Sequence, residues 1–540
     1  FAEHFRNLTS AVGRAGVIVP TGIATDDTTK NFFGDLVDKR SLASLFDFEN
    51  KEAIFPGVHR SYKFCLLTLS GVPVKQAQFI FFATRVEHLR DERRRFTLDP
   101  AEIALFNPNT HTMTIFRTKF DATLNQKIYS RIPPLVHDQK EINRWGVSYR
   151  QGLLHSANDV HLFGQNTFNN LQSRGGVFNG STFVEGKNVY IPLYEAKMIW
   201  LYDYRSGSYK GITDRSNTHL PQTSYEEYNN PEYLPLPYYW VSKDEIDNRL
   251  RNWGPNWLLV FRDVTNSGNE RTVVSTILPK YGLLDQFGLL FIDSNSMAAL
   301  AACLIANLNS LVLDYIARQK INGLHLKKYS IYQLPIFPPE KYHKDSIIFI
   351  SSRVLELIYT ANDIKSFAED LGYYGEPFSW NEARRAVIQS ELDAYYAKLY
   401  GLNRDELRYI LDPQDVYGPD YPGETFRVLK DKEIRQYGEY RTRRLALEAW
   451  DRLEGVDVGN PDAYPAQVAT DPPKQETISV TLPKSESRPA AVQTQLPAPA
   501  KPNSPVMSPA KVVKEIDPPA DQPTLTDFGL YKCEVCGKMV

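Results

Sequence analysis

Alternating and continuous apolar runs in the first part of the chain predict the strands of an α/β sheet. Hydrophobic residues separated by turn residues mark the strands, and one amphipathic run between them marks a helix that Asp26 and Asp27 are placed to cap. The predicted strands cover 17–19, 42–48 and 62–69, and the predicted helix covers 30–37. We interpret residues 1–85 as the last strands of a sheet whose earlier strands are not in this sequence.

The pattern changes twice further along. After a charged connector at 86–144, the segment 145–340 consists of short aromatic-rich strands broken by Gly, Asn and Pro, which predicts an irregular β-rich domain with helical parts. One long apolar run within it predicts a single helix from Ser296 to Gln319, closed by Asn322 and Gly323. Segment 341–455 is helical by pattern, and Asn403 with Glu406 has the spacing of a capping box.

The end of the chain has a different composition. Residues 456–528 are rich in Pro, Ala, Ser, Lys and Thr with almost no aromatics, which predicts a disordered linker. Residues 529–540 contain Cys533 and Cys536, two thiols at the spacing that one tight turn presents to Zn²⁺. Zinc needs four ligands, so we interpret this segment as the start of a truncated zinc-binding module. A redox pair is the weaker reading, because no thioredoxin-like pattern surrounds the cysteines.

Composition narrows the class of protein. The chain has 540 residues, 42% of them hydrophobic, which is enough for a large core. No run of about 18 apolar residues is present, so the sequence predicts no membrane span. Its 4 cysteines are too few for a disulfide scaffold and favour a reducing cytoplasm. The formal net charge of -2 argues against a general polyanion binder, but it leaves room for a local basic groove.

Cationic residues interleave with aromatics in the β-rich segment and at the end of the long helix. This interleaving is compatible with groove recognition or base stacking, although surface ion pairs are the alternative for each cation and most of the aromatics are expected in the core. The candidate DNA-binding residues are Lys197, Arg205, Arg262, Arg271, Arg318, Lys320, Lys327 and Lys328.

No catalytic motif is visible. Transfer to a base amine needs a polar-Pro-Pro-aromatic loop, in which the polar groups accept the amine hydrogens and the aromatic ring stacks on the extruded base. Asp471-Pro-Pro473 and Asp517-Pro-Pro519 lack the aromatic residue and lie in the Pro-rich tail, so we assign them to linker composition. No catalytic residue is therefore proposed from the sequence.

A co-linear set of short motifs resembles one enzyme family. The motifs span residues 1–453 and include Gly16-Val-Ile-Val-Pro-Thr-Gly22, Phe48-Glu-Asn50, Phe55-Pro-Gly-Val-His-Arg-Ser-Tyr-Lys-Phe64, Trp145-Gly-Val147, Ile191-Pro-Leu-Tyr194, Phe261-Arg-Asp-Val-Thr-Asn266, Asn307-Leu-Asn-Ser-Leu311, Gln333-Leu-Pro335, Glu391-Leu-Asp-Ala394 and Tyr437-Gly-Glu-Tyr-Arg-Thr442. In this order they resemble the C-terminal portion of class I, S-adenosylmethionine-dependent adenine-N6 DNA methyltransferases of the Eco57I type, found in type IIG restriction-modification and phage-defence systems. The resemblance departs at Ala196, where a glycine is expected, and in the tail.

The resemblance implies a division of labour. Residues 1–85 would complete a Rossmann-like methyltransferase sheet, 145–340 would be the target-recognition domain and 341–455 a helical domain. Tyr62 and Phe64 would border the pocket of the flipped adenine. The family's glycine-rich cofactor motif and its Asn-Pro-Pro-aromatic loop are absent, so this chain by itself is not expected to methylate. The implied cofactor is S-adenosylmethionine, bound mainly by the missing part, and the implied partner is double-stranded DNA.

Two other functions stay open. In the first, the chain is itself a DNA-binding specificity subunit that acts with a separate catalytic subunit of a restriction or defence system. It is alternatively an interaction scaffold whose aromatic strands serve only its core. Binding of duplex DNA at low salt separates the scaffold from the first two, because phosphate contacts depend steeply on salt.

Overall fold

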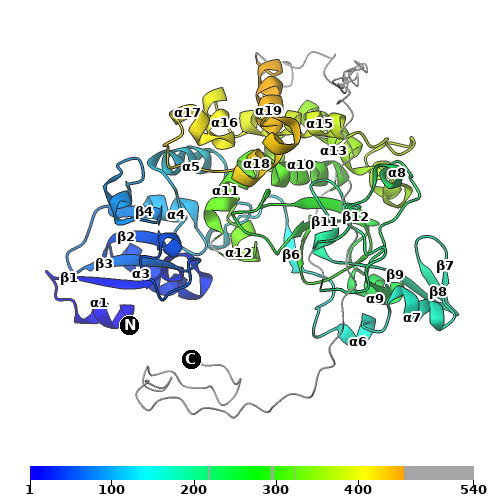
Figure 1. The fold of residues 1–540 in the computed structure, drawn as a ribbon, viewed down its shortest axis with the longest axis horizontal. Helices are drawn as coiled ribbons and strands as arrows, with labels where there is room; N and C mark the ends of the chain where they lie inside the picture. Colours follow the sequence, from blue (N-terminus) through cyan, green and yellow to red (C-terminus); the bar gives the residue numbers. More distant parts are fainter. Residues whose placement is uncertain (217–218, 293–296, 322, 455–540) are drawn as a thin grey trace, which may run out of the picture. The chain divides into compact units, whose positions relative to one another are not determined.

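The computed structural model of the protein describes residues 1–216, 219–292, 297–321 and 323–454. All of these residues belong to one compact unit, which lies within Phe1–Pro472. The predicted linker at 456–528 and the predicted zinc module with Cys533 and Cys536 therefore lie outside the described residues. This unit is a mixed α/β structure with several sheets (Figure 1).

The first sheet gathers three strand ends at one edge. Its strand order is β1-β3-β2-β4-β5. Strand β3 runs antiparallel to both β1 and β2, while β2 and β4 are parallel, so the carboxyl ends of β1, β2 and β4 lie at the same edge. The strands are β1 (Arg14–Pro20), β2 (Leu42–Glu49), β3 (Lys63–Ser70), β4 (Ala77–Ala83) and β5 (Phe96–Leu98).

The predicted strands and helix of this region are confirmed, with two differences. The sheet does not end at the predicted boundary of residue 85, because β5 adds a strand that ends at Leu98. Helix α3 begins after Thr29 without a side-chain cap, and Asp27 instead forms an ion pair with Lys30 at 2.9 Å. The helices here are α1 (Ala2–Leu8), α2 (Gly22–Thr25), α3 (Lys30–Asp38), α4 (Pro100–Phe106) and α5 (Lys119–Arg131).

The middle of the chain forms two further sheets of short strands, as the sequence predicts. One has the order β10-β9-β8-β7 with β13 beside β9, and the other has the order β12-β11-β14-β6. Trp240 and Trp257 are buried in them, which confirms that these aromatics serve the core. The elements are β6 (Ser148–Gln151), α6 (Val160–Phe163), α7 (Phe168–Ser173), β7 (Val177–Phe178), β8 (Phe183–Glu185), β9 (Asn188–Tyr194), α8 (Tyr225–Tyr228), β10 (Tyr239–Ser242), α9 (Lys243–Arg249), β11 (Trp257–Arg262), β12 (Ser275–Pro279), β13 (Gly282–Leu283) and β14 (Phe287–Phe291).

Helices dominate the remainder. Helix α10 packs along α13, and α15 packs along α19. The predicted capping box of α16 is confirmed, since Asn403 and Glu406 each accept a hydrogen bond from the backbone N–H of the other. The helices are α10 (Met297–Asn309), α11 (Leu311–Lys320), α12 (Lys328–Ile331), α13 (Lys344–Ile358), α14 (Lys365–Asp370), α15 (Glu382–Leu399), α16 (Arg404–Leu411), α17 (Pro413–Tyr417), α18 (Arg427–Tyr437) and α19 (Arg441–Arg452).

The single helix predicted from Ser296 to Gln319 is wrong. It is two helices, α10 and α11, bent by 60° at Ser310. The Ser310 hydroxyl caps α11 by accepting from the N–H of Leu313 at 3.3 Å. The side-chain oxygen of the preceding residue, Asn309, accepts a hydrogen bond from the backbone N–H of Ser275 in β12 at 3.0 Å. These polar groups make local and tertiary hydrogen bonds in place of a continuous helix.

Helices α10 and α11 are both rich in apolar residues. Among the described residues, no single helix is long and apolar enough to cross a membrane, although α10 and α11 together pass the test of length and composition. Both helices are buried within the protein core.

Candidate functional site

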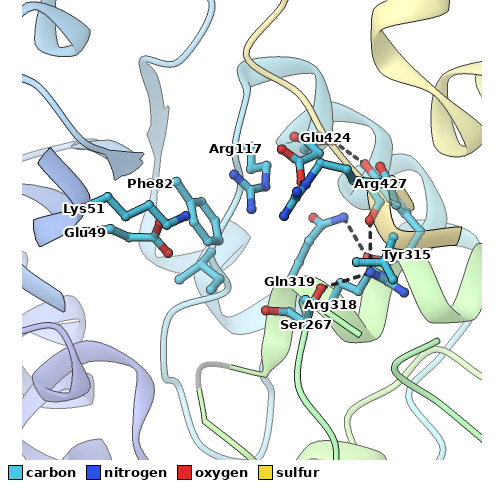
Figure 2. A pocket seen from close by; sticks show the side chains of 15 residues that line it. Glu49, Lys51, Phe82, Arg117, Ser267, Tyr315, Arg318, Gln319, Glu424 and Arg427 are labelled. Atoms are coloured by element: carbon cyan, nitrogen blue, oxygen red, sulfur yellow. Dashed lines mark hydrogen bonds and ion pairs between the residues drawn. The ribbon is translucent and has the colours of Figure 1, made fainter. Parts of the chain in front are cut away.

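A pocket of about 290 Å³ lies at the carboxyl edge of the first sheet (Figure 2). Glu49, at the end of β2, and Phe82, near the end of β4, line one side. Helix α11 and the loops that precede β12 and α18 line the other. In open α/β sheets, ligands bind beyond the carboxyl ends of parallel strands. The charged residues that line the pocket are Glu49, Lys51, Arg117, Asp121, Arg318, Glu424 and Arg427.

A buried carboxylate holds the strand ends at this edge together. Asp47 of β2 accepts a hydrogen bond from the hydroxyl of Thr21, which follows β1, and another from the backbone N–H of Phe82 in β4 at 3.0 Å. Burial raises the pKa of Asp47. Phe82 has a φ of 59°, a conformation that bulky residues rarely adopt. The hydrogen bond from its N–H therefore fixes an unusual backbone at the wall of the pocket.

Among the described residues, Arg117 makes no ion pair with a carboxylate, although it lines this pocket. Its guanidinium lies 4.0 Å from the centre of the Phe82 ring. Within the described parts of the chain, no carboxylate lies at ion-pair distance from it, whereas Lys51 pairs with Glu49 and Arg427 pairs with Glu424 at 2.7 Å. Figure 2 shows the Arg117 side chain pointing into the space between Phe82 and Gln319. An arginine in this setting can bind an anion with its fork of N–H donors.

A carboxylate at the end of β2 in this pocket is kept ionised. Burial alone would raise the pKa of Glu49, but its hydrogen bond to Lys51 and the charges of Lys63, Lys51 and Arg117 hold that pKa below its ordinary value. Glu49 therefore serves as a counter-charge for the lysines on its own side of the pocket.

The opposite wall is rigid because a second buried carboxylate joins three helices. Asp121 of α5 accepts hydrogen bonds from the hydroxyls of Tyr315 in α11, at 2.8 Å, and of Tyr409 in α16, at 2.9 Å. Burial raises the pKa of Asp121. The residues of α11 that line the pocket are thus anchored to the helical region.

The loop that follows β2 is organised by one buried amide. The Asn50 side chain donates to the carbonyls of Phe55 at 3.0 Å and Val58 at 2.8 Å, and it accepts from the N–H of Phe55 at 2.9 Å. The loop leads to the predicted base-pocket residues. Tyr62 is 64% exposed, whereas Phe64 stacks on Phe48 at a ring distance of 5.3 Å. Neither lines the 290 Å³ pocket, and their role at a base stays a prediction.

Replacing Asn50 by alanine is expected to lower the unfolding free energy by about 2–3 kcal/mol, because buried carbonyls and an N–H would lose their partner. Urea unfolding of the variant measures this loss. The exposed Asn170, replaced by alanine, is the control and should change stability by less than about 0.5 kcal/mol. A loss of that small size at Asn50 would mean that the loop does not depend on the amide.

Several of the cations predicted to contact DNA make hydrogen bonds inside the fold. Arg205 is fully buried and donates to the carbonyls of Tyr228 and Thr360, both at 2.9 Å. Lys320 is partly buried and donates to the carbonyl of Phe106, and burial lowers its pKa well below the ordinary value. These contacts give Arg205 and Lys320 structural roles, and their contact with DNA stays a prediction.

Arg271 and Arg318 are likewise paired inside the fold. Both bind the fully buried Asp314, at 2.8 Å and 2.7 Å. Arg318 also donates to the carbonyls of Ser267 and Thr425, so it supports the pocket wall while its charge is already neutralised. These ion pairs give Arg271 and Arg318 a structural role, and their contact with DNA stays a prediction.

The remaining candidates are more accessible. The Arg262 guanidinium donates to the carbonyl of Ile199, and burial lowers its pKa to about 10. Lys197 is half-buried and donates to the carbonyl of Arg215 at 3.1 Å. Lys327 pairs with the buried Asp263 at 2.7 Å, and Lys328 is exposed. For Arg262, Lys197, Lys327 and Lys328, contact with DNA stays a prediction.

Sequence reasoning missed Lys51, Arg117 and Arg427. They lie far apart in the sequence and belong to the predicted methyltransferase part, the connector and the helical part, respectively. Only the fold brings them to one pocket. A weak signal was available for Lys51, which follows directly on the Phe48-Glu-Asn50 motif.

Comparison with known proteins gives a distant likeness to a solved structure. No protein-family model matches the chain, and no curated protein matches it. Among solved structures, that of the type IIG restriction endonuclease BpuSI aligns at 13% sequence identity, covers 76% of this chain and 48% of that protein, and has a TM-score of 0.28. The chain thus spans about half the length of that enzyme. A likeness this distant assigns neither a family nor a fold.

Proposed function

We propose that the chain is the DNA-recognition portion of a site-specific adenine-N6 DNA methyltransferase of a cytoplasmic restriction-modification or phage-defence system. In this proposal, the pocket at the carboxyl edge of the first sheet faces the duplex. The β-rich region between residues 145 and 340 selects the target sequence. The reaction is the direct transfer of a methyl group from S-adenosylmethionine to the N6 amine of an extruded adenine.

The observation that carries the proposal is Arg117, a guanidinium without an acidic partner among the described residues, at the sheet edge where open α/β folds bind ligands. Phosphate oxygens are the anions that such a fork of donors fits best. The co-linear motifs between residues 1 and 453 give independent support.

The methyl donor does not fit the residues present. The sequence contains neither a glycine-rich strand-turn-helix of the cofactor-binding kind nor an Asn-Pro-Pro-aromatic loop. We therefore assign cofactor binding and catalysis to residues outside this chain, and no catalytic step is derived from its own side chains.

This absence favours a second candidate, a specificity subunit that binds DNA for a separate catalytic subunit. Reading the genomic frame around the coding segment separates the two candidates. A continuous frame that encodes both motifs upstream supports the methyltransferase. A start codon shortly before Phe1, with the motifs in a neighbouring gene, supports the specificity subunit.

Replacing Arg117 by alanine is expected to weaken binding of duplex DNA and to reduce the dependence of log affinity on log salt by about 1, as for the loss of one phosphate contact. Fluorescence anisotropy with a labelled duplex over a salt series measures both quantities. Arg404, whose guanidinium already pairs with Asp451 at 2.6 Å, is the matched control, and its alanine variant should keep the wild-type slope.

Two outcomes would contradict the proposal. If the Arg117→Ala variant has the wild-type slope, the pocket does not contact phosphate. If the wild-type chain fails to bind duplex DNA at low salt, the interaction scaffold becomes the better account.

We also propose that Cys533 and Cys536 supply two thiolates to a zinc ion. The metal content of the chain, measured by mass spectrometry, is expected to fall when both are replaced by serine. An unchanged zinc content would show that the metal is held elsewhere or that the pair has another role.

A further inference from the structure

A short ladder beside the pocket presents apolar side chains to solvent. Residues 263–265 and 324–326 pair through the Leu326 N–H to the carbonyl of Asp263, at 2.8 Å, and the Thr265 N–H to the carbonyl of Leu324, at 2.9 Å. Asp263, Thr265 and Leu326 are buried. In contrast, Val264 is 50% exposed and Leu324 is 64% exposed. We call these two side chains the Val264–Leu324 tip.

The tip is continuous with the pocket. Ser267 and Gly268, which follow Val264 in the same loop, line the pocket, and so does Gln319 at the end of the helix that precedes Leu324. The tip therefore lies beside the pocket.

Two lysines follow the tip in the chain. Lys327 pairs with Asp263, but that carboxylate is buried, so the ammonium is the part of the pair that faces solvent. Lys328 is exposed as well. An apolar centre with a basic rim suits a polyanion with an apolar interior, which is the chemistry of a nucleic-acid duplex.

We propose that the Val264–Leu324 tip enters the base stack of bound duplex DNA and holds it open next to the pocket. This inference rests on the proposed function, and it assigns the separation of stacked bases to the tip. Apolar side chains inserted between base steps unstack and kink a duplex, with the cost offset by the additional contact. Chemistry on a base within a duplex requires that the base leave the stack.

The test uses the full chain and two short duplexes, one fully paired and one with a single central mismatch that contains 2-aminopurine. If the tip acts as a wedge between bases, the chain is expected to bind the mismatched duplex about tenfold more tightly than the paired one, because an unpaired base is already partly unstacked. The fluorescence of 2-aminopurine should also rise on binding. The double variant Val264→Ala/Leu324→Ala should lose this preference and the fluorescence rise. Because the phosphate contacts are untouched, it should keep the wild-type salt dependence on the paired duplex.

The control is Ile18→Ala, which removes an equally exposed apolar side chain, 59% accessible, from β1. It should retain the mismatch preference. Loss of the preference in the double variant alone, with its melting temperature unchanged, supports the wedge. Wild-type binding to both duplexes with equal affinity would overturn the wedge while leaving the proposed function intact. Absence of duplex binding would overturn both, and a change of oligomeric state in the double variant would make the tip a contact between copies of the chain.

Discussion

Replacing Asp314 by alanine is expected to lower the unfolding free energy by about 3–5 kcal/mol, a large share of the stability of a typical domain. Asp314 is fully buried in α11 and binds two guanidinium groups, those of Arg271 at 2.8 Å and Arg318 at 2.7 Å. It also accepts from the backbone N–H of Thr272 at 2.9 Å. The variant would leave two buried positive charges without a counter-charge, which costs far more than the loss of one contact.

Thermal unfolding followed by circular dichroism measures this effect. The matched control is Asp451→Ala, which breaks an ion pair with Arg404 that is largely open to solvent and is expected to cost less than about 1 kcal/mol. If both substitutions lower the melting temperature by the same small amount, Asp314 does not neutralise the two buried arginines.

Replacing Asp393 by asparagine is expected to stabilise the protein above pH 7 and to have little effect near pH 4. Burial raises the pKa of Asp393 from its ordinary 3.8 to about 7, an effect that the nearby Arg271 reduces only in part. Because the folded pKa exceeds the unfolded one, the stability present below pH 3.8 is lost as the pH rises towards 7. The loss amounts to at most about 4 kcal/mol.

Asparagine carries no charge to bury, and its carbonyl oxygen can still accept from the N–H of Leu311, which lies 2.8 Å from the Asp393 carboxylate. Urea unfolding of both proteins from pH 4 to pH 8 checks the prediction. The two stability curves should diverge with rising pH, with the variant above the wild type. Parallel curves would show that Asp393 is ionised in the fold throughout this range.

The local features of the fold were accessible from the sequence. The strands at 17–19, 42–48 and 62–69 were predictable because the spacing of apolar residues within each short segment indicates a strand. The capping box of α16 was predictable because it involves only Asn403 and Glu406. The bend at Ser310 was missed because the apolar run continues across it. What breaks the helix is a tertiary partner, Ser275, which no local pattern shows.

The candidate site was less predictable than the fold. Arg205 and Lys328 are equally cationic in the sequence, yet one is fully buried and the other is exposed. The difference comes from carbonyls such as that of Thr360, which lies far along the chain from Arg205. Arg117 was missed for the complementary reason: its significance is that no carboxylate among the described residues lies at ion-pair distance from it, and a sequence does not show distances.

Because α11 begins at the break after Ser310, the position of this break determines which side chains of α11 face the pocket. Helix α10 is clamped in the helical region, whereas α11 carries Tyr315, Arg318 and Gln319 to the pocket. Each residue of an α-helix turns the next by about 100°, so inserting or deleting one residue between Ser310 and Tyr315 would rotate these side chains away from the cavity. Over evolutionary time, this stretch should accept substitutions but not changes of length.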